Sequence, residues 1–198
     1  MLLKRELEQL YLQERLSVSI IAHRLRCSQG KINYWLSEYK IQKRTISDAL
    51  YHKWNPAGDP FSARKPKTIE DAILYGLGIG LYWGEGTKSN KVSVRLGNSD
   101  PRLIKKFMKF LISLYQIDEK KLRFGLQIFA DMNAKATLNF WTHSLKVSHK
   151  QFYKIIVTPY RGVGNYRQKT KYGVLTVYFN NRKLRDIICH AIEEESMR

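Results

Sequence analysis

The sequence has little cysteine, no long hydrophobic run and few acidic residues. Its two cysteines, Cys27 and Cys189, stand far apart and outside any CxxC pattern, which argues against a disulfide framework or a zinc site. The longest uncharged apolar run, residues 72–83, is shorter than the roughly 20 residues that cross a bilayer. Charged residues interrupt the first six positions, which is untypical of a signal peptide. These absences predict a reduced, cytoplasmic protein with no membrane segment.

The scarcity of acids gives the chain a strong positive charge. Lys and Arg number 35 against 17 Asp and Glu, a net charge of +18 over 198 residues. Nucleic acid is the usual partner of such a surface, because phosphate contacts dominate its affinity. A ribosomal or an anionic-membrane partner is the alternative. With 43% apolar residues and 12 tyrosines, the chain has the composition of a folded protein rather than of a basic tail.

The first 50 residues have the pattern of a helix-turn-helix domain. A leading helix is expected over residues 4–14, and Ser17 and Ser28 are suited to cap two further short helices. The second and third helices would be joined by a tight turn, as in DNA-binding proteins, although the usual glycine of that turn is absent. An ordinary three-helix bundle with a polar face is the alternative. Candidate base or phosphate contacts at the start of the third helix are Gln29, Lys31, Asn33 and Tyr34.

A linker and a larger second domain follow. Residues 51–68 are rich in proline, glycine and charge, which is typical of a linker. Over residues 69–198 the periodicity predicts the order α-β-α-β-α-β-β-α, and hence an α+β domain with a mostly antiparallel sheet. The expected helices cover 68–84, 102–115, 134–145 and 184–194, and the expected strands cover 91–96, 122–129, 152–158 and 172–179.

The helix over residues 68–84 carries the most informative pattern. Gly76, Gly80 and Gly84 recur every four residues and therefore share one helix face. Each glycine costs a helix roughly 1 kcal/mol relative to alanine, so we expect a compensating close approach by the same helix of a second chain. Glu85 ends this helix, and Gly86 is suited to terminate it. A carboxylate is disfavoured at that end of the helix dipole, which indicates a cation nearby.

Basic residues gather at two further places in the second domain. One helix face carries a stripe that either contacts phosphates or is simply solvated: Arg102, Lys105, Lys106 and Lys109. A glycine-containing basic loop before the last strand carries a second group, Arg161, Arg167, Lys169 and Lys171, of which Arg161 and Arg167 are candidate DNA contacts.

Residues 78–86 (GIGLYWGEG) resemble the LAGLIDADG motif of homing endonucleases. Gly80 matches the internal glycine of the motif, Glu85 its terminal acid and Gly86 its last glycine, whereas Trp83 replaces the first acid. Residues 55–61, 98–101 and 140–141 are similar to a microbial branch that joins a helix-turn-helix to this domain. The resemblance covers residues 70–195 and implies a LAGLIDADG-like fold with a saddle-shaped sheet over DNA.

The resemblance also implies an activity. Two motif helices, one from each subunit of a homodimer, would pair through Gly76, Gly80 and Gly84. Each Glu85, with a backbone carbonyl near Gly84, would bind Mg²⁺ or Mn²⁺ and cut double-stranded DNA. Residues suited to polarise the attacking water are Lys169, Lys171 and, as second choice, Lys88.

Two alternatives to cleavage remain at this stage. Some relatives in this family bind DNA as transcription regulators without cutting it, and the strand hairpin expected after the motif helix is cramped here. The two lysines of the basic loop could also serve only to neutralise phosphate, and Glu85 could make only a structural hydrogen bond. A phosphate-binding loop at residues 84–89 is disfavoured, because it lacks the Gly-Lys-Ser/Thr sequence.

Overall fold

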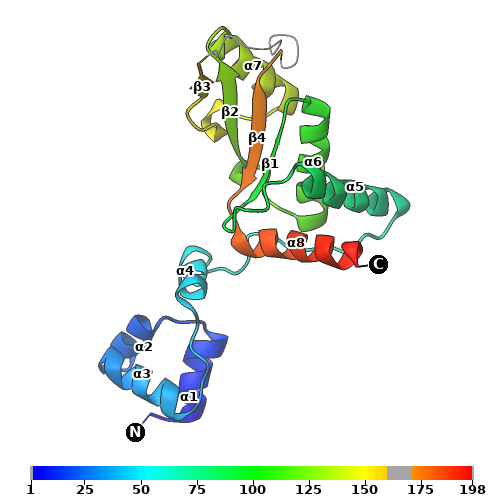
Figure 1. Cartoon of the computed structure of the whole chain (residues 1–198). Helices are drawn as coiled ribbons and strands as arrows, with labels where there is room; N and C mark the ends of the chain where they lie inside the picture. Colours follow the sequence, from blue (N-terminus) through cyan, green and yellow to red (C-terminus); the bar gives the residue numbers. More distant parts are fainter. Residues whose placement is uncertain (1, 160–170, 198) are drawn as a thin grey trace. The chain divides into compact units, whose positions relative to one another are not determined.

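A computed structural model of the chain describes residues 2–159 and 171–197. The chain divides into two compact units, one ending at Pro60 and the other beginning at Phe61 (Figure 1). Each unit has its own hydrophobic core.

The first unit is helical. It contains α1 (Lys4–Glu8), which continues as the π-helix η1 (Gln9–Gln13), then α2 (Val18–Arg24) and α3 (Gln29–Glu38). The side chains of Ser17 and Ser28 accept hydrogen bonds from backbone N–H groups in the first turns of α2 and α3, as predicted. The helix expected over residues 4–14 is present over residues 4–13, and its second half is π-helical rather than α-helical. The core consists of Leu7, Leu10, Tyr11, Ile21, Ala22, Ile32, Leu36 and Ile41.

Arg26 occupies the place of the missing turn glycine. It lies between α2 and α3 with φ of 49°, in the left-handed region that costs a non-glycine residue about 1–2 kcal/mol. The turn between α2 and α3 is therefore formed without a glycine, at the expense of local strain.

We predict that Arg26→Gly stabilises the first unit by roughly 1 kcal/mol, because glycine adopts this conformation without strain. Hydrogen exchange of α2 and α3 amides in the full chain measures the change. Ser37→Gly, an exposed position within α3, should instead accelerate exchange, since glycine lowers helix stability. Faster exchange in Arg26→Gly would show that the turn is not strained.

The region expected to be a linker, residues 51–68, is partly structured. Helix α4 (Ile46–Trp54), capped by Thr45, runs into it. On the other side of the boundary, the Ser62 N–H donates to the Tyr115 carbonyl (2.9 Å) and the Arg64 N–H to the Leu114 carbonyl (2.7 Å). Phe61 packs against the core of the second unit. Only the middle of the predicted linker has linker character.

The second unit has the predicted order of elements. Its helices are α5 (Ile69–Glu85), α6 (Pro101–Tyr115), α7 (Ala134–Leu145) and α8 (Arg182–Ser196), with short 3₁₀ turns at Glu119–Lys121 and His149–Gln151. Its strands are β1 (Val94–Asn98), β2 (Arg123–Phe129), β3 (Ile156–Thr158) and β4 (Val174–Phe179). This confirms the α+β class.

The four strands form one sheet in the order β1-β4-β2-β3. The pairs β1–β4 and β2–β4 are antiparallel, whereas β2–β3 is parallel, so the sheet is mostly antiparallel, as predicted. Strand β3 is shorter than the predicted 152–158, and only one isolated bridge, Phe124 to Phe152, extends its pairing.

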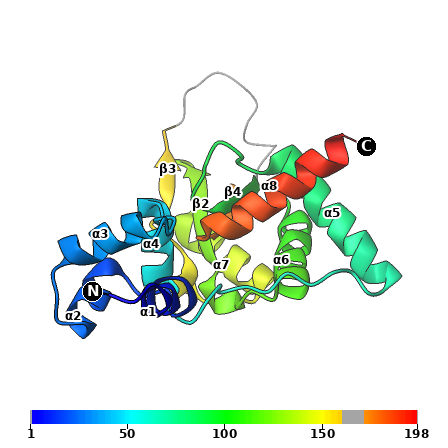
Figure 2. The same cartoon turned by 90° about the horizontal axis from the view of Figure 1, so that it is seen from below.

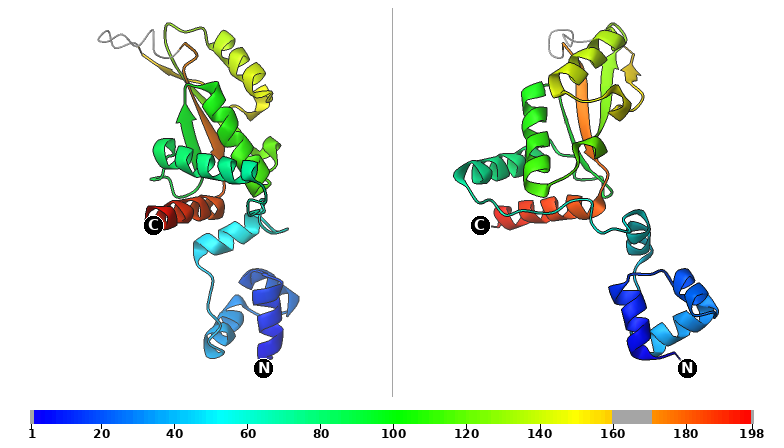
Figure 3. Two further views of the ribbon diagram at one scale, coloured as in Figure 1. Left: turned by 90° about the vertical axis from the view of Figure 1, so that its right-hand side faces the viewer. Right: turned by 180° about the vertical axis from the view of Figure 1, so that it is seen from behind.

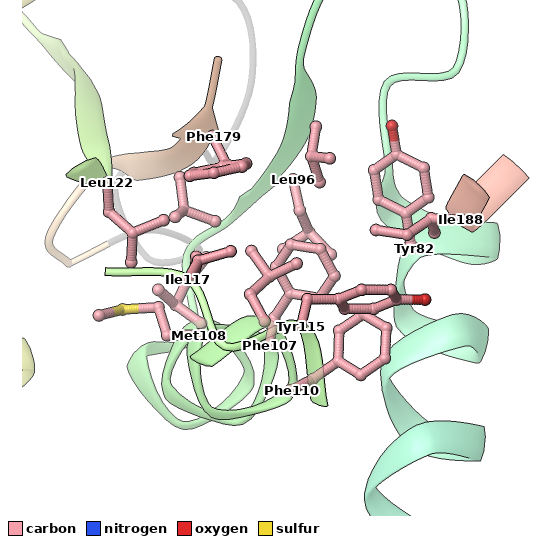
Figure 4. Packing of buried hydrophobic residues seen from close by; sticks show 14 of the residues in the cluster. Tyr82, Leu96, Phe107, Met108, Phe110, Tyr115, Ile117, Leu122, Phe179 and Ile188 are labelled. Carbon is pink, nitrogen blue, oxygen red and sulfur yellow. The ribbon is translucent and has the colours of Figure 1, made fainter. Parts of the chain in front are cut away.

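One face of the sheet is buried under the helices (Figure 3). Alternate strand residues such as Leu96 and Phe179 point into a core shared with α6, and Phe107 and Phe110 are fully buried there (Figure 4). The intervening residues of each strand form the other face of the sheet, which is partly exposed. Helices α5 and α8 lie side by side at one end of the sheet (Figure 2).

Candidate functional site

The predicted glycine face of α5 points to solvent. A Cβ added at Gly76, Gly80 or Gly84 would meet nothing within 4 Å. The same face exposes large apolar side chains, with Ile69 76% and Ile73 65% exposed. Contiguous exposed apolar surface of this kind is typical of an interface with a partner.

A different glycine brings α5 close to its own core. A Cβ at Gly78 would lie 2.1 Å from Cγ of Phe110, so only glycine allows α6 to pack at this distance. The sequence spacing puts Gly78 on the opposite side of the helix from the glycine repeat, but it does not indicate which side is buried. Within one chain the close helix approach is therefore at Gly78, and the glycines repeated every four residues remain uncovered.

Glu85 is exposed where α5 ends and the sheet begins. The next residue, Gly86, terminates the helix in an extended conformation and bridges Leu96 of β1. The Thr87 N–H then donates to the Arg95 carbonyl (2.9 Å). The expected hairpin is thus reduced to a minimal pairing, and it fixes Glu85 beside β1.

Two cations of the protein lie at this end of α5. The Lys88 ammonium donates a hydrogen bond to the Trp83 carbonyl in the last turn of the helix. The Arg185 guanidinium, from α8, donates to the Lys88 carbonyl. Lys88 therefore supplies the cation that the position of Glu85 against the helix dipole indicates.

The metal-ligating potential of a single chain is small. Over the described part of the chain, no group of three or more His, Cys, Asp or Glu side chains could hold a metal ion. Mg²⁺, however, is commonly bound through one or two carboxylates together with phosphate oxygens and waters. An exposed Glu85 fits a site of that kind, with further ligands from a nucleic acid or a second chain.

The open face of the sheet carries a basic and aromatic row that begins at Arg95, whose carbonyl accepts from the Thr87 N–H two residues after Glu85. Arg95 of β1 pairs with Tyr178 of β4, which pairs in turn with Arg123 of β2. The Arg95 guanidinium lies 5.2 Å from the Tyr178 ring centroid, and the Tyr153 ring packs edge-on against the same tyrosine at 5.5 Å. The next row, Gly97, Thr176 and Gly125, has small side chains and keeps the surface shallow.

Sequence reasoning missed this row. The sequence feature that could have indicated it is the alternation of side chains along each strand, which places Arg95 on the opposite face from the buried Val94 and Leu96. Because Arg123 and Tyr178 come from strands far apart in the sequence, only the sheet pairing brings them beside Arg95.

The predicted basic stripe of α6 lies elsewhere. Arg102, Lys105, Lys106 and Lys109 are exposed, on the side of α6 away from the core and hence away from the open face of the sheet. Arg102 is also paired with Asp100, with 3.0 Å between Nη2 and Oδ2, and its hydrogen bond lowers the pKa of that carboxyl. The structure therefore does not join this stripe to Glu85 or to the sheet row.

The residues predicted in the basic loop are placed only in part. Arg161, Arg167 and Lys169 lie outside the described residues. Lys171 lies 5.4 Å from the centroid of the Tyr172 ring, which stacks on Phe140 of α7. Lys171 precedes β4, whereas Gly86, the residue after Glu85, bridges Leu96 of β1, which pairs with Val177 in the middle of β4. Of the candidate lysines that the structure describes, Lys88 is thus the one near Glu85 of the same chain.

The candidate DNA contacts of the first unit share the start of α3. Gln29, Lys31 and Tyr34 are exposed and Asn33 is half-buried. Gln29 and Asn33 lie one turn apart on one face, and the Tyr34 ring packs edge-on against Trp35 at 5.3 Å. Lys31 and Tyr34 lie one turn apart on a different side of α3 from Gln29 and Asn33, so the four candidates do not share one face of the helix.

Comparisons with models of protein families, with curated proteins and with solved structures found no match. Over residues 2–159 and 171–197, none of the helices combines the length and the hydrophobicity that crossing a bilayer requires.

Proposed function

We propose that this protein is a metal-dependent endonuclease that cuts double-stranded DNA at a specific site, acting as a homodimer with a LAGLIDADG-like domain. The observation that carries the proposal is the outward-facing glycine and apolar surface of α5, with an exposed acid at its end.

Dimerisation would proceed through this surface. Two copies of α5 packed face to face could approach backbone to backbone at Gly76, Gly80 and Gly84, because no Cβ intervenes. Ile69 and Ile73 would lose their exposure to water in the same interface. The two Glu85 residues would then end neighbouring helices on one side of the dimer.

The acids would act on the DNA phosphates. A bound Mg²⁺ or Mn²⁺ would lower the pKa of a water molecule and stabilise the charge of the pentacovalent phosphorus. Glu85, together with the carbonyl groups at the end of α5 near Gly84, would hold the cation against a phosphate oxygen. The Lys88 ammonium, in the same turn of the chain, would stabilise negative charge on the phosphate.

DNA would lie on the open face of the sheet and on α3. The row formed by Arg95, Tyr178 and Arg123 offers two cations and an aromatic ring. Gln29 and Asn33 carry amide groups that can pair with adenine edges in the major groove. The net charge of +18 would supply the affinity that does not depend on sequence.

We predict that Arg95→Ala and Arg123→Ala each reduce the slope of log affinity against log salt by about 0.9, the loss of one phosphate contact. Fluorescence anisotropy with labelled DNA at several salt concentrations, without metal, measures the slope. Lys109→Ala on α6 is the matched control and should leave it unchanged. A slope that responds to Lys109 and not to the two arginines would place DNA on the helical side.

Cleavage itself is tested with a DNA library and Mg²⁺ or Mn²⁺, using Glu85→Gln as the inactive control. Specific cuts by the wild type and none by the variant support the proposal. Specific binding with no cleavage under any of these conditions would favour the alternative, a DNA-binding transcription regulator that retains the fold.

A further inference from the structure

We infer that Arg185 is a positioning residue that holds Lys88 at the end of α5, so that the ammonium stays on the Trp83 carbonyl in the helix turn that ends at Glu85; this inference rests on the proposed function. It concerns a residue of α8, about a hundred positions from the acid in the sequence.

The contacts of Arg185 define this role. Its side chain is only 16% exposed. Nη1 lies 3.0 Å from a carboxylate oxygen of Asp186, and Nη2 donates to the Lys88 carbonyl. The loop that follows Glu85 is thus fastened to α8 by a charge-assisted hydrogen bond, which is about twice as strong as a neutral one.

Lys88 is in turn held at its other end. Its ammonium donates to the Trp83 carbonyl in the last turn of α5, so the residue links that turn to α8. Were the Lys88 backbone released, the ammonium would lose its fixed position while Glu85, which belongs to the helix, would keep its own.

One nitrogen of the Arg185 guanidinium is buried without a hydrogen-bond partner. Among the described residues, Nε of Arg185 and the hydroxyl of Tyr82 are the buried side-chain polar atoms without a hydrogen-bond partner. Tyr82 of α5 is fully buried beside Ile188 of α8 (Figure 4). Burying a charged group with one donor unsatisfied is costly. The hydrogen bond from Nη2 to the Lys88 carbonyl offsets part of this cost.

The experiment compares Arg185→Ala and Arg185→Lys with Asp186→Ala, which removes the exposed partner of Arg185 and leaves the contact with Lys88. The first readout is the rate at which acetic anhydride modifies Lys88 in the full chain, without DNA or metal, measured by peptide mass spectrometry relative to Lys91. We expect Arg185→Ala to raise this rate about tenfold, the loss of one hydrogen bond to a charged group. Arg185→Lys should restore part of the protection, and Asp186→Ala should have little effect.

The second readout is single-turnover cleavage. Arg185→Ala should lower the single-turnover rate constant at saturating protein about tenfold with the half-saturating protein concentration unchanged, and the change should vanish in a Lys88→Met background. A folded Arg185→Ala variant with wild-type modification of Lys88 would overturn the inference. If the wild type does not cut DNA, the proposed function fails, and the modification rates alone decide whether Arg185 positions Lys88.

Discussion

Glu85→Gln is expected to slow Mg²⁺-dependent cleavage of DNA at least about 100-fold, or 2.7 kcal/mol of transition-state stabilisation. The amide keeps the size of the side chain but removes the charge that holds the cation. DNA binding without metal should be unchanged or slightly tighter, because a negative charge near the phosphates is lost. Single-turnover cleavage and anisotropy on the same DNA separate the two effects.

Glu70→Gln is the matched control for this prediction. Glu70 is also an exposed glutamate of α5, but it belongs to the first turn of the helix. Its replacement should leave cleavage intact. If both variants lose activity equally, only the net charge of α5 affects cleavage, and the position of Glu85 does not. If both retain activity, Glu85 takes no part in the reaction.

Alanine at Gly78 and at Gly80 should have opposite effects on the stability of a dilute monomer. Gly78→Ala places a methyl group 2.1 Å from an atom of the Phe110 ring, and overpacking of this kind costs typically about 1–3 kcal/mol, occasionally more. At Gly80 the added methyl group meets open space. Because alanine favours a helix over glycine by about 0.8–1.0 kcal/mol, Gly80→Ala should stabilise the monomer.

Urea denaturation at nanomolar concentration, followed by tryptophan fluorescence, measures both changes. Phe110→Leu in the Gly78→Ala background should recover part of the loss, since the smaller side chain gives the methyl group room. Two equally destabilised alanine variants would mean that the face with Gly80 is buried within its own chain.

Much of the second unit was predictable because its signals are local. Asn133 caps α7 and Asp100 caps α6 with Pro101 in the first turn, and both helices begin where the sequence indicates. The pairing of strands is not local. Nothing near β3 predicts its parallel alignment with β2 or its short length, because β-propensity does not specify a partner. Helix α4 was missed because the proline and glycine that follow Trp54 suggested a linker.

The candidate site was predictable only in part. The acid at the end of α5 and the glycine repeat follow from spacing along one helix. Spacing separates Gly78 from the glycine repeat, but which side of α5 faces the core depends on α6, so the close contact at Gly78 could not be predicted. Arg185 and Arg123 reach the neighbourhood of Lys88 and Arg95 only through tertiary packing. The basic stripe of α6 was a candidate phosphate contact, but a stripe of exposed basic residues is equally consistent with a solvated helix face.

Sedimentation equilibrium of the full protein tests most directly whether α5 joins two copies of this chain. We expect a dimer at micromolar concentration, alone or on target DNA, and a monomer for Gly80→Leu, whose larger side chain keeps the helices apart while α5 itself remains folded. A wild-type protein that stays monomeric at these concentrations, both free and on DNA, or a dimer that is unaffected by Gly80→Leu, would mean that α5 does not join two copies.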